Sequence, residues 1–214
     1  MQASTLISSL PKLLLATHNR GKATELSDLL GNIPFQVVTL ADLGIADDVE
    51  EGVASFEENA RLKARHYARL SGELTLADDS GLEVDALGGE PGPLSKRYAG
   101  ENASDDERNR FLLSKLENVP WERRRAAFRC ALAIAWPEGQ VEEVQGECRG
   151  IIAFEPKGDH GFGYDPVFYI PELGKTMAEL ILDEKNRLSH RARAAEKARE
   201  VLERIARETA PKGV

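Results

Sequence analysis

The spacing of hydrophobic and polar residues along the chain switches between patterns typical of strands and patterns typical of helices. Short apolar runs bounded by turn residues predict buried strands, and apolar residues three or four positions apart predict amphipathic helices. A Ser or Thr followed three residues later by Glu marks three helix starts. We therefore predict strands at 12–17, 35–40, 74–77, 124–136 and 140–154, and helices after the turn at 18–22 and at 55–72, 104–116, 176–179 and 189–208.

The order of these elements predicts an α/β fold with a mixed sheet, because strands alternate with helices and one long hairpin turns at 137–139. The 214 residues suit one large domain built of two closely joined lobes. We expect residues 11–210 to form this domain and residues 1–10 to be a disordered extension. The segment 81–100, which is rich in Gly and Pro, is predicted to be a loop with short extended pieces.

Composition and charge narrow the classes of function. The net charge of -8 argues against a general nucleic-acid binder, because affinity for the phosphate backbone needs a positive surface. No apolar run approaches membrane-spanning length, and the start of the chain lacks a secretory signal, so we expect no membrane partner and a cytoplasmic location. Cys130 and Cys148 lack metal-ligand spacing and are expected to be reduced and buried.

The first candidate site is Thr17-x-Asn19-x-x-Lys22, which lies between a predicted strand and a helix. Free backbone N–H groups at a helix N-terminus favour anions, and Lys22 adds a positive charge suited to phosphate. The glycine spacing of a Walker loop is missing. By itself the segment also fits an ordinary capped turn with a solvated lysine.

The second candidate is Asp78-Asp79-Ser80-Gly81, which follows the predicted strand 74–77 directly. Carboxylates at a strand end can hold Mg²⁺ through their oxygens, and one of them can act as a general base for water. Acidic residues at 50, 51 and 58 could join them in the fold. A polar turn with an N-cap aspartate explains the segment equally well.

Two later segments could hold a base. Gly161 to Pro166 places Phe162 and Tyr164 among glycines, which suits stacking on a purine ring, although aromatics that complete the core would have the same pattern. Lys185, His190 and Arg191 could contact a base carbonyl and phosphates, although a basic helix entrance on the surface is the commoner explanation for such residues. Similarly, Arg123 to Arg125 is expected to decorate a strand end.

Taken together, these segments resemble the inosine/xanthosine triphosphate pyrophosphatase family, whose members remove non-standard purine nucleotides. The matching pieces extend from Leu14 to Ala194 and comprise Thr17–Lys22, Ser55–Ala60, Ala77–Leu82, Ser95–Gly100, Gly161–Pro166 and Glu184–Arg191. Leu94 stands where the family often has an aromatic residue, and Lys96 where a small residue is usual. Both departures concern the local shape of one loop beside the cleft.

The resemblance implies a two-lobed fold with a long central mixed β-sheet flanked by helices, a cleft between the lobes, and a homodimer. It implies hydrolysis of ITP, dITP and XTP to the monophosphate and pyrophosphate with Mg²⁺ as cofactor, which protects nucleic acids from incorporation of these nucleotides. It makes Asp79 the catalytic proton acceptor and Glu50 and Asp79 the metal ligands. The substrate-binding residues that it implies are Thr17, His18, Asn19, Arg20, Gly21, Lys22, Ser80, Phe162, Gly163, Tyr164, Asp165, Lys185, His190 and Arg191.

A nucleotide sensor without enzymatic activity is the alternative from a different class. It would bind a purine nucleotide in the same cleft and signal through a partner. Asp79, Glu50 and Lys22 argue against it, since a binder needs no carboxylate that activates water.

Overall fold

The computed structural model describes residues 10–49 and 55–209 of the chain. Within them the strands form one mixed sheet with the order β2-β1-β3-β4-β5-β6-β7, so the α/β prediction is confirmed. The predicted extension 1–10 lies outside the described residues except for Leu10. The strands are β1 (Lys12–Leu15), β2 (Gln36–Thr39), β3 (Leu74–Val84), β4 (Arg125–Ala135), β5 (Val141–Ile152), β6 (Phe168–Ile170) and β7 (Lys175–Thr176).

Five α-helices accompany the sheet within the described ranges: α1 (Arg20–Leu30), α2 (Phe56–Ser71), α3 (Asp105–Lys115), α4 (Leu182–Leu188) and α5 (His190–Thr209). The predicted caps explain two of them. Ser55 begins α2 by accepting a hydrogen bond from the amide of Glu58, and Gly72 ends it with φ 71°, which favours glycine. Ser104 and Glu107 form the predicted capping box of α3. Helix α4 is an element that the sequence pattern did not predict.

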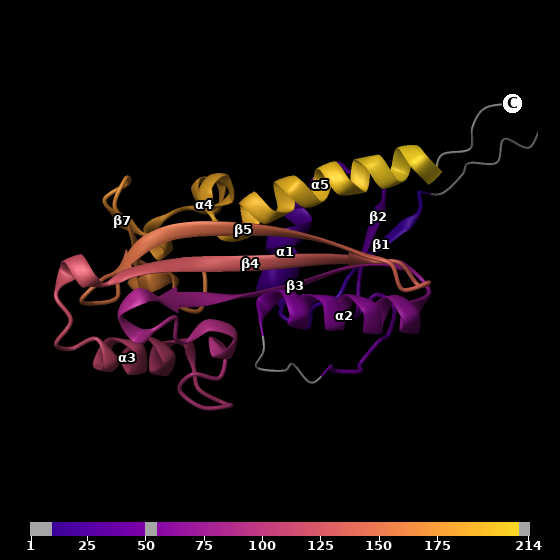
Figure 1. The fold of residues 1–214 in the computed structure, drawn as a ribbon. Coiled ribbons are helices and arrows are strands. Elements are labelled where there is room, and N and C mark those ends of the chain that lie inside the picture. The colour runs from indigo at the N-terminus through magenta and orange to yellow at the C-terminus, as the bar shows by residue number, and fades with distance from the viewer. Residues whose placement is uncertain (1–9, 50–54, 210–214) are drawn as a thin grey trace, which may run out of the picture.

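Three long strands run through the length of the molecule and connect its two ends (Figure 1). Strand β4 pairs with β3 from Thr75 to Val84 and with β5 along its whole length. The prediction that the first of these strands ends at Ala77 is therefore wrong, as is the loop assignment of residues 81–84. Pairing with β4 satisfies the backbone groups beyond Ala77, and this tertiary gain overrides the turn-like composition of the segment.

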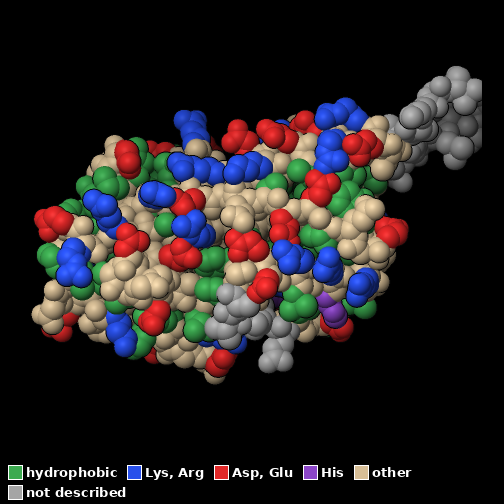
Figure 2. All heavy atoms as spheres, viewed as in Figure 1, with side chains coloured by type: hydrophobic (Ala, Val, Ile, Leu, Met, Phe, Trp, Pro, Cys, Tyr) green, Lys and Arg blue, Asp and Glu red, His purple; other side chains and the backbone are tan. Residues whose placement is uncertain are grey.

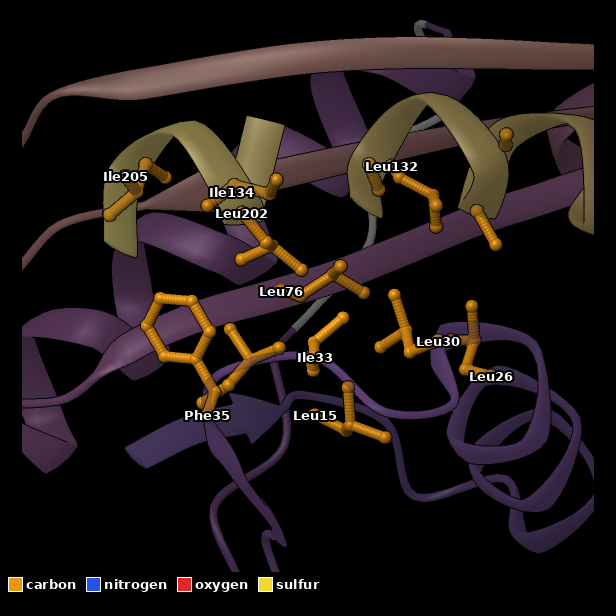
Figure 3. Packing of buried hydrophobic residues seen from close by; sticks show 14 of the residues in the cluster. Leu15, Leu26, Leu30, Ile33, Phe35, Leu76, Leu132, Ile134, Leu202 and Ile205 are labelled. Atoms are coloured by element: carbon orange, nitrogen blue, oxygen red, sulfur yellow. The ribbon is translucent and has the colours of Figure 1, made fainter. Parts of the chain in front are cut away.

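Helices cover both faces of the sheet. Helices α1 and α5 pack on one face through a cluster that includes Leu26, Leu76 and Leu202 (Figure 3). Helix α2 packs on the opposite face through small residues such as Ala60 and Ala64 (Figure 1). A third apolar cluster lies at the other end of the long strands and contains residues of α3, β6 and the turn after β7. No helix of the described chain is long and apolar enough to cross a membrane.

The short strand β1 leaves part of the edge of β3 uncovered. β1 pairs with β3 only as far as Leu15 opposite Leu76. From Ala77 onward, the only strand of the described residues that pairs with β3 is β4, apart from an isolated bridge between Glu83 and Pro91. The chain leaving β1 turns away into α1, and this departure places the residues after Ala16 beside Asp79 and Ser80.

Candidate functional site

A cavity of about 630 Å³ lies beside the uncovered part of β3. Its wall combines all four segments singled out from the sequence, which lie up to 174 residues apart along the chain. Of the residues implied to bind substrate or catalyse, it is lined by Thr17, His18, Asn19, Gly21, Lys22, Asp79, Ser80, Phe162, Gly163, Tyr164, Asp165, Lys185, His190 and Arg191. Arg20 is exposed and does not line the cavity.

The turn after β1 is ordered by its own side chains. Asn19 caps α1, since its Oδ1 accepts a hydrogen bond from the amide of Lys22 at 3.1 Å. Thr17 Oγ1 accepts one from the amide of Asn19 at 3.2 Å. The N-terminus of α1 therefore faces the cavity with Lys22 on the wall, an arrangement that favours a bound anion.

Asp78 and Asp79 point to opposite faces of β3, because successive side chains of a strand alternate. Asp79 faces α2, where its Oδ2 accepts a hydrogen bond from Asn59 Nδ2 at 2.9 Å. Lys63 Nζ lies 3.6 Å from its Oδ1. Asp79 is 5% exposed and lines the cavity, whereas Asp78 does not line it. Of the two carboxylates, only Asp79 is therefore placed to meet a ligand.

Asp78 faces α1 and α5 instead. Its Oδ2 lies 2.9 Å from Lys22 Nζ and 3.8 Å from Arg191 Nη2. Ser80 Oγ links the same groups, because it donates to Asp78 at 3.3 Å and accepts from Arg191 at 2.9 Å. Burial opposes ionisation of Asp78, but Lys22 and Arg191 outweigh it and hold its pKa well below the usual range.

The loop 161–165 forms the aromatic wall. The carboxylate of Asp165 accepts a hydrogen bond from the amide of Phe162 at 2.9 Å and so stabilises the conformation of the loop. The ring of Phe162 lies 4.8 Å from Lys185 Nζ and 5.6 Å from the guanidinium carbon of Arg191. Helix α3 holds Gly163, whose amide donates to Asp105 Oδ2 at 2.7 Å. Phe162 is thereby placed between the turn after β1 and a group of buried cations.

Lys185 on α4 and Arg191 in the first turn of α5 are buried, so the alternative explanation of a basic helix entrance on the surface is wrong for them. Lys185 and Arg191 are 4% and 1% exposed, and carboxylates hold both. His190 stacks on Phe128 with ring centroids 4.8 Å apart. Burial, together with the nearby Arg191 and Lys185, lowers the pKa of His190 well below its usual value. His190 is therefore neutral at pH 7.

A second expectation about surface charge holds for Arg123 and Arg125, which are exposed, and fails for Arg124. Arg124 is 2% exposed and not a solvated strand end. Its guanidinium donates hydrogen bonds to the carbonyls of Leu116, Ile152 and Ala153 at 2.7 to 2.8 Å. It joins the end of α3 to the end of β5 and so supports the third apolar cluster.

Two carboxylates of the cavity wall suit a hard cation that a polyphosphate helps to bind. Asp48 and Asp79 line the cavity, and Mg²⁺ commonly takes one or two carboxylates together with phosphate oxygens. Over residues 10–49 and 55–209, no cluster of three or more His, Cys, Asp or Glu forms a metal cage without such a ligand. Glu50, the other implied metal ligand, lies outside the described residues.

Asn59, Lys63 and Glu25 are among the residues of the site that were not identified from the sequence. Asn59 and Lys63 lie on α2 and contact Asp79. Their spacing of four positions puts them on one helix face, which is the signal that could have revealed them. Glu25 is 4% exposed beneath Lys185 and Arg191. A carboxylate next to Leu26 on the buried face of α1 is unusual, and that conflict with the apolar pattern was its signal.

Comparison with known proteins gives a consistent result. The Ham1 family model matches residues 13–201. A dITP/XTP pyrophosphatase of Desulforamulus reducens is 50% identical over 194 residues, which cover 91% of this chain and 96% of the relative. Another dITP/XTP pyrophosphatase, from Geobacter sulfurreducens, is 51% identical over 183 residues, covering 86% and 92%.

A solved structure of a Ham1 protein has a similar fold. The Ham1 protein of Coxiella burnetii superimposes with a TM-score of 0.83 at 41% sequence identity. The match covers 90% of this chain and 98% of that protein. The likeness therefore extends over nearly the whole fold.

Proposed function

The chain belongs to the Ham1 family, and from this premise we propose that it is a hydrolase that converts dITP, XTP and ITP to the monophosphate and pyrophosphate. The observation that carries the proposal is the cavity itself. It combines a helix N-terminus with Lys22, a carboxylate of β3 and an aromatic wall, which suit a triphosphate, a reacting water and a base, respectively. Removal of such nucleotides would protect nucleic acids from their incorporation.

The chemistry follows from the placement of Asp79. Its carboxylate takes a proton from a water molecule, and the oxygen of that water attacks the α-phosphorus. The bond between the α-phosphorus and the oxygen that bridges it to the β-phosphorus then breaks. Pyrophosphate leaves with the electron pair of that bond. Asp79 and Glu50 would hold Mg²⁺, which when bound neutralises the polyphosphate and polarises the phosphoryl oxygens.

The cations of the cavity stabilise the charge that develops on the leaving group. Lys22 and the N-terminus of α1 face the phosphates from one side. Lys63 approaches from α2, on the side of Asp79. Charges that are already in place at the cavity wall stabilise the transition state more strongly than they would in free solution. Arg20 is exposed and has no direct part in this scheme.

Selection of the base rests on hydrogen-bond donors. Hypoxanthine and xanthine carry a 6-oxo acceptor, whereas adenine carries a 6-amino donor. Lys185 and Arg191 lie beneath the ring of Phe162 and have only donors to offer. A 6-amino group facing them leaves buried donors unpaired, and mismatches of this kind discriminate by roughly 10⁴-fold.

The remaining expectations are kept as part of the proposal. Residues 11–210 form one catalytic domain, because a single sheet connects the apolar clusters of both ends. Two chains form a homodimer in the cytoplasm, where the buried thiols of Cys130 and Cys148 stay reduced. Acidic and basic side chains are interspersed on the face seen in Figure 2, which favours neither nucleic acid nor an anionic membrane as a partner.

The decisive experiment measures pyrophosphate release from a panel of nucleoside triphosphates with Mg²⁺. We expect turnover of dITP and XTP and only slow turnover of dATP. Equal rates on dITP and dATP would refute the base selection. Release of orthophosphate alone would refute the reaction class, and dITP that stays bound and unchanged would favour the nucleotide sensor.

A further inference from the structure

Charged residues of alternating sign form a continuous row along the cavity, buried except at Lys22, whose side chain is 17% exposed. Lys185 Nζ lies 2.8 Å from Asp165 Oδ2 and 3.0 Å from Glu25 Oε1. Glu25 also forms an ion pair with Arg191. Arg191 in turn lies near Asp78, and Asp78 forms an ion pair with Lys22. We call the six residues the charge row; in order they are Asp165, Lys185, Glu25, Arg191, Asp78 and Lys22.

The ends of the charge row meet different parts of the cavity. At one end Asp165 holds the amide of Phe162, in the loop that faces the base. At the other end Lys22 lies in the first turn of α1, which the proposed function places against the phosphates. The three cations of the row line the cavity, whereas Glu25 and Asp78 do not. These two carboxylates therefore act on a substrate only through the cations that they hold.

Burial makes the row respond as a unit. Glu25 and Asp78 are 4% and 1% exposed, and each is shared between two cations. A buried charge that loses a partner is costly, because water cannot replace that partner. When Lys185 or Arg191 moves toward a base, its interaction with Glu25 or Asp78 weakens, and that carboxylate then binds its other cation more strongly. The low local dielectric strengthens this coupling.

We propose that Glu25 and Asp78 are positioning residues that couple recognition of the base to placement of Lys22 against the phosphates. The coupling rests on the proposed function and extends it. A 6-oxo base that accepts hydrogen bonds from Lys185 and Arg191 orders the charge row. Asp78 then holds the ammonium group of Lys22 beside the pyrophosphate that leaves. Base identity is thereby expressed in kcat as well as in KM.

The kinetic test compares Asp78→Asn and Glu25→Gln with the wild type on dITP and dATP. Asp78 lies at the phosphate end and does not line the cavity, so a local role would slow both nucleotides by the same factor. Coupling predicts that the ratio of kcat for dITP over dATP falls by roughly 10-fold or more in each variant. Glu142→Gln is the matched control, because it removes a carboxylate from the half-exposed pair with Arg204. We expect it to keep the wild-type ratio.

A binding test on the wild-type protein covers the case in which a variant fails to fold. Calorimetry measures the affinity of inorganic tripolyphosphate with and without saturating deoxyinosine. We expect deoxyinosine to tighten tripolyphosphate binding at least about 5-fold and deoxyadenosine to leave it unchanged. Equal affinity in all three conditions overturns the coupling, as does an unchanged kcat ratio in folded variants.

The two proposals fail in different ways. If the wild type releases no pyrophosphate from dITP, the proposed function falls and the coupling falls with it. If the wild type is active and both variants slow dITP and dATP equally, only the coupling is wrong.

Discussion

At the scale of single residues, alternation along one strand divides two adjacent aspartates between two tasks. Asp79 faces α2 and the cavity, while Asp78 faces the buried cations of α1 and α5. The sequence suggested this division only through the family resemblance. In the structure it follows from the pleat of β3, which turns neighbouring side chains to opposite faces.

The role of Asp79 predicts the behaviour of Asp79→Asn. The amide can accept a hydrogen bond from Asn59 but cannot take a proton from water, so kcat on dITP should fall by roughly 10²- to 10⁴-fold. Pyrophosphate release measures kcat, and calorimetry checks that dITP still binds. A variant with wild-type kcat would remove Asp79 from the catalytic role.

The burial of His190 predicts a dependence of stability on pH. The folded state keeps the imidazole neutral, so below the unfolded pKa of about 6.5 the unfolded state binds the extra proton. As the pH decreases below this value, the free energy of unfolding should therefore decrease more steeply in the wild type than in His190→Gln. The difference between the two slopes should be up to about 1.4 kcal/mol per pH unit. Urea unfolding between pH 7 and 5 measures both slopes. Parallel slopes would contradict the buried neutral state.

At the scale of elements, the close approach of α5 to β5 sets the position of the cations. A Cβ on Gly146 would lie 2.1 Å from the carbonyl oxygen of His190 and 2.5 Å from the amide nitrogen of Ala194. Only glycine therefore allows the first turn of α5 to lie on the strand. This contact places Arg191 beneath Phe162, and nothing in the spacing of β5 indicated it.

The same contact predicts the effect of Gly146→Ala. The methyl group must push the first turn of α5 away, which should destabilise the fold by about 1–3 kcal/mol and raise KM for dITP. Thermal unfolding and steady-state kinetics measure the two effects. Gln145→Ala alters the neighbouring exposed position of β5 and serves as the control, which should retain both properties. Wild-type stability in Gly146→Ala would show that α5 can move at little cost.

At the scale of the whole molecule, the cavity collects residues from both ends of the sheet. The turn after β1 belongs to one end, and the loop at 161–165 is held by α3 from the other. A nucleotide that contacts both should stabilise the whole chain. For Asp79→Asn, dITP at 100 times its Kd should add about 2.7 kcal/mol to the free energy of unfolding.

Thermal unfolding of Asp79→Asn with dITP and with dATP at equal concentrations provides the measurement. Stabilisation should be larger with dITP, since only its 6-oxo group accepts from Lys185 and Arg191.

Wild-type protein treated with EDTA tests the cofactor. Removal of the metal should abolish turnover, and Mg²⁺ should restore it. Full activity in EDTA would contradict a metal-dependent reaction.

The sequence by itself determined the helices and strands with strong local signals. The caps at Ser55 and Ser104 and the hairpin at 137–139 lie as predicted, because capping and turn chemistry act within a few residues. The motifs also determined the family. Nearly all the residues predicted to bind substrate line one cavity, with Arg20 as the exception, and their role in binding stays a prediction.

Only the tertiary structure decided where β3 ends, which charges are buried, and which acid faces the cavity. Pairing with β4 extends β3 through Asp78 and Asp79, and this gain depends on a strand about 50 residues away. The burial of Arg124, Lys185 and Arg191 likewise depends on partners far along the chain. Local composition cannot reveal such partners, since a charge that is solvated in one fold is paired in another.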